Sequence, residues 1–339
     1  MKFDFAIGNP PYQEETENNG RQSPVYNRFM DEAYKVADCV ELITPARFLF
    51  NAGQTPKAWN DKMLQDEHFK VLKYESDASK VFANTEIKGG VAITIRDSQK
   101  TYGKIGIFTE FDELNSILRK VLPHCEKSIS DICIGAVPYK YTETFRNEHP
   151  EWVDLAGDSF DLRTNALDKL GNKIFFEKRQ NENDVAQIVG LFNKKRASLF
   201  VDRRYIDVPT NFDKYKVLLS KANGSGKFGE ALSQMIIAEP KVGHTQSFIS
   251  VGNFETKKEA ENLEKYIKAK FTRCLLSILR TTQDTTPYKW KYVPLQDFTD
   301  SSDIDWSKSI AEIDKQLYKK YNLSDEEITF IETKVKEME

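Results

Sequence analysis

The chain has 339 residues, of which 30% are charged and 12% aromatic, with a net charge of −3 and a pI of about 6.0. This length suffices for two domains with buried cores, and the composition excludes an intrinsically disordered chain. No apolar stretch approaches the roughly 20 residues of a membrane span, so we expect no membrane contact. The four cysteines form no CxxC pair and three of them lie in apolar runs, so we expect reduced, buried thiols in a cytoplasmic protein. The four histidines are scattered, so we expect no metal site.

Residues 1–100 alternate predicted strands with predicted helices. A short buried strand is expected over Phe3–Ile7, directly before Asn9, and apolar residues at helical spacing predict a helix over 25–36. Alternating strands and helices indicate an α/β sheet, in which sites form at the carboxyl ends of the strands. We therefore expect Asn9 to lie at such an end. The further strands are predicted over 40–43, 69–74 and 90–95, and a helix is predicted to end near residue 64.

Residues 101–300 lose this rhythm and predict a mixed α+β module with long loops, suited to recognition. Residues 301–339 predict a helical tail with two helices. Asp305 or Ser307 can cap the first, and Ser324 with Glu327 makes a capping box for the second. In the middle part, one helix is expected over 257–279 and short β-like runs over 104–108, 132–139, 174–177, 198–201, 233–237 and 247–251.

The run Asn9-Pro10-Pro11-Tyr12 carries the clearest chemical signal. The exocyclic amino group of adenine is a poor nucleophile because its lone pair is delocalised into the ring. Two acceptors against its hydrogens would align it for attack on a methyl group. The Asn9 side chain and the Pro10 carbonyl would supply them, held rigid by the two prolines. Tyr12 would stack on a base flipped out of the duplex. The alternative is a plain turn after a strand.

With these motifs the chain resembles the N6-adenine methyltransferase part of large bacterial restriction–modification enzymes. The resemblance implies a partial Rossmann-like methyltransferase sheet over residues 1–100, a DNA target-recognition domain over 101–300 and the helical tail over 301–339. It also implies S-adenosylmethionine as methyl donor and double-stranded DNA as partner, with Phe82, Thr44 and Pro45 around the target-base pocket. The resembling segments are Phe5–Tyr12, Tyr26–Met30, Leu42–Leu49, Lys88–Ile93, Lys221–Gly226, Asp284–Pro294 and Asp303–Trp306.

The departure from the family concerns the methyl-donor site. The family binds its donor with a glycine-rich turn after the first strand and an acidic residue after the second, both upstream of the Asn-Pro-Pro-Tyr motif. Nothing before Phe3 supplies them, so we expect the first strands and the donor-binding motif to be missing from this chain. We then expect either the C-terminal piece of a longer enzyme or a split product that needs an upstream methyltransferase or nuclease segment or subunit. A catalytically silent recognition module and a restriction endonuclease subunit are the alternatives.

Two further patterns need weighing. Asp77 with Glu86-Ile87-Lys88 matches the loose pattern of metal-dependent nucleases, although such spacing is frequent by chance. Gly224-Ser225-Gly226-Lys227 lacks the Walker spacing, so it predicts either a backbone contact with a DNA phosphate or an ordinary turn. Basic residues of the second half are candidate phosphate contacts, with a solvated surface as the alternative. They are Lys194, Lys195, Arg196, Arg203, Arg204, Lys221 and Lys227.

Overall fold

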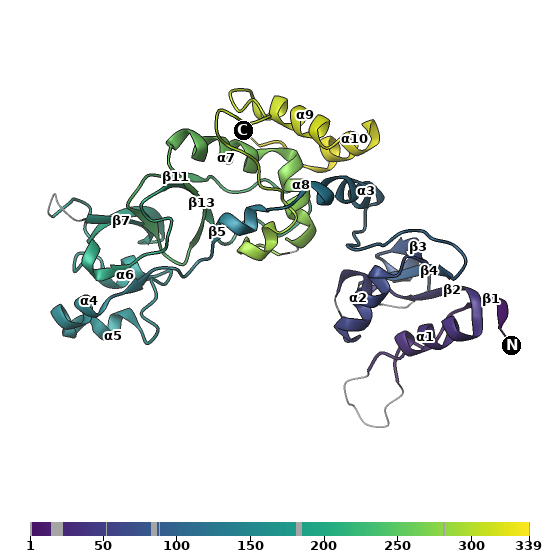
Figure 1. Cartoon of the computed structure of the whole chain (residues 1–339). Coiled ribbons are helices and arrows are strands. Elements are labelled where there is room, and N and C mark those ends of the chain that lie inside the picture. The colour runs from purple at the N-terminus through teal and green to yellow at the C-terminus, as the bar shows by residue number, and fades with distance from the viewer. Residues whose placement is uncertain are drawn as a thin grey trace. The chain divides into compact units, whose positions relative to one another are not determined.

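The computed structural model describes residues 2–14, 23–51, 53–82, 87, 89–180, 185–280 and 282–338 (Figure 1). The chain forms two compact units, Met1–Ser116 and Ile117–Glu339. Both contain helices and β-sheet, so the protein is mixed α/β, as the sequence indicates. No helix in the described ranges is long and apolar enough to cross a membrane. The functional division at residues 100 and 300 stays a prediction.

The N-terminal unit is built on a four-stranded sheet in the order β1-β2-β4-β3. Three strands run in the same direction, and β4 runs antiparallel between β2 and β3. The helix α1 joins β1 to β2, which makes a parallel βαβ unit of the kind that the sequence predicts. The elements are β1 (Phe3–Gly8), α1 (Tyr26–Val36), β2 (Ala37–Pro45), α2 (Lys57–Gln65), β3 (Phe69–Glu75) and β4 (Val91–Asp97).

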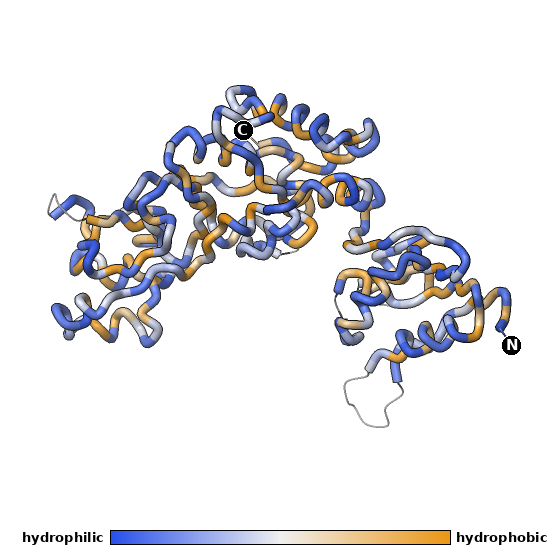
Figure 2. The backbone as a smooth tube through the Cα atoms, viewed as in Figure 1, coloured by the Kyte–Doolittle hydropathy of each residue, from blue (hydrophilic) through white to orange (hydrophobic). Residues whose placement is uncertain are grey.

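The strand β1 lies at the edge of this sheet and is exposed, so the prediction of a buried strand is wrong. It is rich in hydrophobic residues, with Asp4 as its one charged residue, and hydrophobic stretches are visible near the N-terminal end of the tube (Figure 2). Neighbouring side chains of a strand point to opposite faces. On one face Ala6 packs against the core under α1 and α2. On the other face Phe3, Phe5 and Ile7 are 66%, 53% and 73% exposed.

The C-terminal unit contains a four-stranded sheet in the order β11-β10-β13-β5, a three-stranded sheet in the order β12-β7-β8, and the short pair β6-β9. Helices at its C-terminal end pack around α8. The strands are β5 (Cys133–Ile134), β6 (Lys140–Tyr141), β7 (Val185–Phe192), β8 (Lys195–Asp202), β9 (Ile206–Asp207), β10 (Tyr215–Ser220), β11 (Ile236–Ala238), β12 (Val242–His244) and β13 (Phe248–Phe254). The helices are α3 (Asp112–Val121), which spans the division, α4 (Glu143–Glu148), α5 (Val153–Ala156), α6 (Ala166–Leu170), α7 (Lys257–Lys268), α8 (Lys270–Leu279), α9 (Ile310–Lys320) and α10 (Asp325–Lys334).

Several local predictions for this part need correction. The strands β7 and β10 were not expected, and residues 104–108 form no strand. The helix expected over 257–279 is broken at Ala269, whose extended backbone (ψ 141°) separates α7 from α8. Ser309, with Glu312 as its capping-box partner, caps α9 in place of Asp305 or Ser307. The capping box of Ser324 and Glu327 at α10 is confirmed.

Candidate functional site

The predicted site residues of the N-terminal unit lie where the parallel strands of its sheet end. This side of the sheet, at the carboxyl ends of the strands, is called the carboxyl edge. Asn9 follows β1, and Thr44 and Pro45 end the neighbouring parallel strand β2. Pro45 and Glu75 both pair with Val91, so the end of β3 lies at the same edge. The loop from Asn9 to Tyr12, the end of β2 and the segment with Phe82 after β3 therefore share the carboxyl edge of the three parallel strands, where α/β sheets bind their ligands.

The backbone holds the Asn9–Tyr12 loop against the start of α1. The carbonyl of Tyr12 accepts the amide of Val25 at 3.1 Å, and the carbonyl of Ser23 accepts the amide of Glu14 at 3.0 Å. The Asn9 side chain is exposed, whereas Tyr12 is half-buried and packs against the core. The loop thus presents an open amide next to an anchored aromatic ring.

The Tyr12 hydroxyl is buried and has no hydrogen-bond partner among the described residues. Burial raises the pKa of Tyr12, and the nearby Asn9 side chain opposes this shift, although the two groups make no hydrogen bond of normal geometry. The hydroxyl is therefore neutral at physiological pH, and the ring can serve as a flat contact surface.

Three buried polar atoms of this unit lack a hydrogen-bond partner among the described residues. They are the hydroxyl oxygens of Tyr12 and Thr44 and the Oδ1 atom of Asn27. Buried polar groups are normally paired, and an unpaired one costs roughly 1–3 kcal/mol. Tyr12 and Thr44 belong to the sheet edge just described, and Asn27 lies one position after the first residue of α1. We infer that this edge is prepared for a polar ligand.

Asn27 was missed as a site residue by sequence reasoning. The only signal was a polar residue on the buried side of a predicted helix, next to the buried Tyr26 and near Met30. Phe82 is partly buried, and its amide donates to the carbonyl of Ala78 at 2.9 Å. Its predicted place opposite Tyr12 stays a prediction.

The nuclease pattern gains no support from the described residues. The Asp77 carboxylate caps a short 3-10 turn by accepting the amide and hydroxyl of Ser79, and these bonds lower the pKa of Asp77. Glu86 and Lys88 lie outside the described residues. Within the described ranges, no group of three or more histidine, cysteine, aspartate or glutamate side chains could hold a metal ion.

The candidate DNA-binding residues of the C-terminal unit differ in whether their side chains already have partners within the protein. Arg203 and Arg204 have such partners. Arg204 is neutralised by Asp202 at 2.8 Å and Glu148 at 3.1 Å. Arg203 donates to the carbonyl of Ile206 and lies over the ring of Phe212.

The candidate lysines are exposed or half-buried, and their side chains make no ion pair among the described residues. Lys194 occupies the exposed tip of the β7–β8 hairpin with a left-handed backbone (φ 61°), and Lys195 follows it, exposed, at the start of β8. Arg196, although exposed, donates to the carbonyl of Gln234 and lies over the ring of Phe248. Lys227 is exposed and Lys221 is half-buried. Within the described part of the chain, the side chains of Lys194, Lys195, Lys221 and Lys227 make no ion pair.

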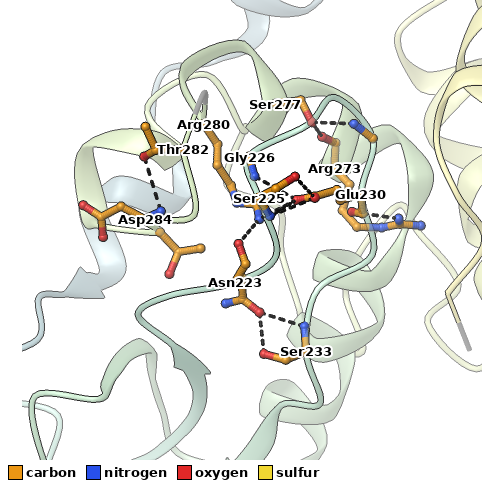
Figure 3. Close-up of polar contacts among 12 residues, drawn as sticks. Asn223, Ser225, Gly226, Glu230, Ser233, Arg273, Ser277, Arg280, Thr282 and Asp284 are labelled. Atoms are coloured by element: carbon orange, nitrogen blue, oxygen red, sulfur yellow. Dashed lines mark hydrogen bonds and ion pairs between the residues drawn. The ribbon is translucent and has the colours of Figure 1, made fainter. Parts of the chain in front are cut away.

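The glycine-rich loop is occupied by a carboxylate of the chain itself (Figure 3). The amides of Ser225 and Gly226, predicted to contact a DNA phosphate or form a turn, donate to the Glu230 side chain at 2.9 and 3.0 Å. The hydroxyl of Ser225 donates to the same carboxylate at 2.6 Å. These two amides are therefore not available to a phosphate in this structure.

Parts of the chain are similar to a family model and to known proteins. Residues 1–82 match the family model described as Eco57I restriction-modification methylase. Over 118 residues the chain is 31% identical to an uncharacterized adenine-specific methylase of Mycoplasma pneumoniae, which covers 33% of this chain and 28% of that protein. The type IIG restriction endonuclease BpuSI is similar at 9% identity and a TM-score of 0.29, over 87% of this chain and 44% of its own. The chain spans less than half the length of either protein.

Proposed function

We propose that this chain, whose residues 1–82 match the family model of Eco57I restriction-modification methylases, holds a target adenine in DNA while its N6 atom is methylated. The observation that carries the proposal is the position of Asn9–Tyr12. This loop lies at the carboxyl edge of parallel strands, beside Thr44 and Pro45. An exposed amide, a rigid proline carbonyl and an anchored ring are the groups that an extrahelical amino-purine requires.

Each residue has a distinct proposed role. The Oδ1 atom of Asn9 and the carbonyl oxygen of Pro10 accept the two N6 hydrogens, which turns the nitrogen lone pair toward the methyl group. The ring of Tyr12 stacks on the base, and such stacking is worth roughly 1–3 kcal/mol. The Thr44 hydroxyl and the Asn27 amide oxygen, which are buried and have no partner among the described residues, are proposed to gain one when the base binds.

The methyl donor, proposed to be S-adenosylmethionine, supplies the electrophilic methyl group when bound. The described residues of the N-terminal unit do not fit this group. The turn after β1 contains Pro10 and Pro11 where a glycine-rich turn is needed, and residues 46–51, which follow β2, include no acidic residue. We therefore assign donor binding to residues other than those described here.

The exposed apolar face of β1 is the observation that favours a further segment packing against this unit. Parallel sheets are normally covered on both faces, and an uncovered apolar edge strand is unusual for a stable surface. Phe3, Phe5 and Ile7 form such a surface next to Asn9. We propose that the donor-binding segment, in the same polypeptide or in a partner chain, adds to the sheet here.

The C-terminal unit is proposed to recognise the DNA sequence around the adenine. The β7–β8 hairpin and the glycine-rich loop carry lysines that are exposed or half-buried and make no ion pair among the described residues. Lysines in such positions can contact phosphates and fix the register of the protein on duplex DNA.

The test is methylation in cells. The gene and its neighbouring reading frames are expressed in a host without N6-adenine methylation, and N6-methyladenine is mapped by single-molecule sequencing. We expect one sequence motif to be modified, and Asn9→Ala to abolish the signal. Gln99→Ala is the matched control, because Gln99 is an exposed amide that follows β4 at the opposite ends of the strands, away from the carboxyl edge. Full methylation with Asn9→Ala would overturn the assigned chemistry. Sequence-specific DNA binding without methylation would favour a silent recognition module.

A further inference from the structure

Two loops of the C-terminal unit are joined into one element by their backbones. One is the glycine-rich loop 221–227 and the other is the segment 282–288. The amide of Asn223 donates to the carbonyl of Gln283 at 2.7 Å, and the amide of Thr285 donates to the carbonyl of Lys221 at 2.9 Å. The hydroxyl of Thr285 donates to the same Lys221 carbonyl at 3.0 Å, and Ala222 forms a bridge with Asp284. These hydrogen bonds therefore join the two loops into one structural element.

Glu230 locks this element from the inside (Figure 3). Besides the three donors of Ser225 and Gly226, its carboxylate faces the guanidinium of Arg280 at 3.1 Å. The same Arg280 nitrogen donates to the carbonyl of Asn223 at 2.6 Å. These donors outweigh the effect of burial and lower the pKa of Glu230 to about 2, so the carboxylate stays charged.

Two glycines of the loop allow this close packing around the Glu230 carboxylate. A side chain at Gly226, which has a φ of 87°, would meet the backbone of Thr282 at 2.4 Å. A side chain at Gly224 would meet the Glu230 carboxylate at the same distance. The Arg280 side chain is 1% exposed, and a buried ion pair costs desolvation. Such a pair is a poor source of stability but a good means of selecting one conformation.

The outer side of the element carries groups that suit DNA. Lys227 and Gln283 are exposed and Lys221 is half-buried, and none of these side chains has a hydrogen-bond or ion-pair partner among the described residues. Lysine contacts phosphates as a point charge, and glutamine can pair with the edge of adenine in the major groove. Tyr288, at the end of the second loop, is 60% exposed.

We propose that loops 221–227 and 282–288 form one DNA-contact element, and that Glu230 is the positioning residue that holds it in its binding conformation. The inference rests on the proposed function, because it assigns DNA as the ligand of the C-terminal unit. Glu230 does not touch DNA in this arrangement. It acts as a permanent internal anion in a backbone nest that resembles a phosphate site, and so directs phosphate contact to Lys221 and Lys227.

The test is a double-mutant cycle on the full chain, read by fluorescence anisotropy with duplex DNA at several salt concentrations. We expect Glu230→Gln to weaken binding about tenfold, and the slope of log affinity against log salt to fall by about 1–2, because each lost phosphate contact reduces it by about 1. Lys227→Ala should weaken binding in the native background but have little further effect with Glu230→Gln. Glu239→Gln, an exposed glutamate at the turn after β11, is the matched control.

Hydrogen exchange measured without DNA tests whether Glu230 holds the conformation of the loop independently of DNA binding. Glu230→Gln should accelerate exchange at 223–227 while the melting temperature of the unit changes little. Additive effects of Glu230→Gln and Lys227→Ala, or an unchanged salt slope, would overturn this inference and leave DNA recognition by the unit intact. If the unaltered chain binds no duplex even at low salt, both this inference and the proposed recognition function fail.

Discussion

The carboxylate of Asp314 in α9 accepts the backbone amide of Phe271, in the first turn of α8, at 2.9 Å. Its other oxygen accepts the amide of Lys270 at 3.0 Å. The break at Ala269 leaves the first amides of α8 without partners inside the helix, and α9 supplies the acceptor from 43 residues away in the chain. The Asp314 side chain is 1% exposed, and burial raises its pKa to about 6.

We predict that Asp314→Ala destabilises the C-terminal unit by about 2 kcal/mol, because it leaves two buried amides unpaired. Asp314→Asn keeps one acceptor and should lose less than half of this. Urea denaturation at pH 7 followed by circular dichroism measures both values. Equal losses in the two variants would show that the cap is not the source of the stability.

The fold of the N-terminal unit follows from its local sequence to a large extent, whereas that of the C-terminal unit does not. The α1 helix and the order of strands and helices reflect periodicity that the chain shows directly. The cap of α8 could not be predicted, because Ala269 looks helical and Asp314 is distant. The exposure of β1 also escaped prediction, since an edge strand rich in apolar residues has the same local pattern as a buried one.

The candidate site was predictable to the extent that it is contiguous. Asn9–Tyr12 is a local motif after a strand, so its place at the sheet edge follows from the chain order. The unpaired atoms of Asn27 and Thr44 depend on packing, and no pattern announces them. The same holds for Glu230, whose partners come from the glycine-rich loop and from Arg280 in a separate segment.

Thr44→Val should separate stability from function at the sheet edge. The Thr44 side chain is fully buried and its hydroxyl has no partner among the described residues. Replacing the hydroxyl by a methyl group removes an unpaired polar atom, so we expect the free energy of unfolding to stay equal or rise by up to about 1 kcal/mol. We expect methylation to fall in the same variant. A loss of stability together with methylation would indicate a purely structural role.

The buried His244 should make the C-terminal unit sensitive to acid. Its Nε2 atom has no partner within the described ranges, and burial lowers its pKa to about 4. The unfolded chain binds the proton near pH 6.5, whereas the folded chain does not. Stability from this group is therefore complete above pH 6.5 and is lost as the pH falls toward 4, by up to about 3 kcal/mol. An NMR titration that finds the folded His244 ring protonating near pH 6.5 would refute the prediction.

Arg204 and Lys195 should differ in their contribution to DNA binding. The guanidinium of Arg204 is already paired with Asp202 and Glu148, whereas the Lys195 ammonium makes no ion pair among the described residues. We expect Lys195→Gln to lower the salt slope of DNA binding by about 1, as one phosphate contact does, and Arg204→Gln to change it little. Anisotropy titrations over a range of salt concentrations compare the two. A larger effect of Arg204→Gln would mean that its ion pairs break when DNA binds.

The exposed face of β1 allows a test of the proposal that a donor-binding segment adds to the sheet at this strand. Because Ile7 is 73% exposed, Ile7→Ser should change the stability of this chain by no more than about 0.5 kcal/mol. If the donor-binding segment adds to the sheet at β1, the same change buries a hydroxyl in an apolar contact, and methylation should fall at least tenfold in cells that express the complete system. Leu72→Ser is the matched control, because Leu72 is 47% exposed on β3 at the other edge of the sheet. Equal methylation by both variants would mean that the donor segment docks elsewhere, and the apolar surface of β1 would then need another explanation.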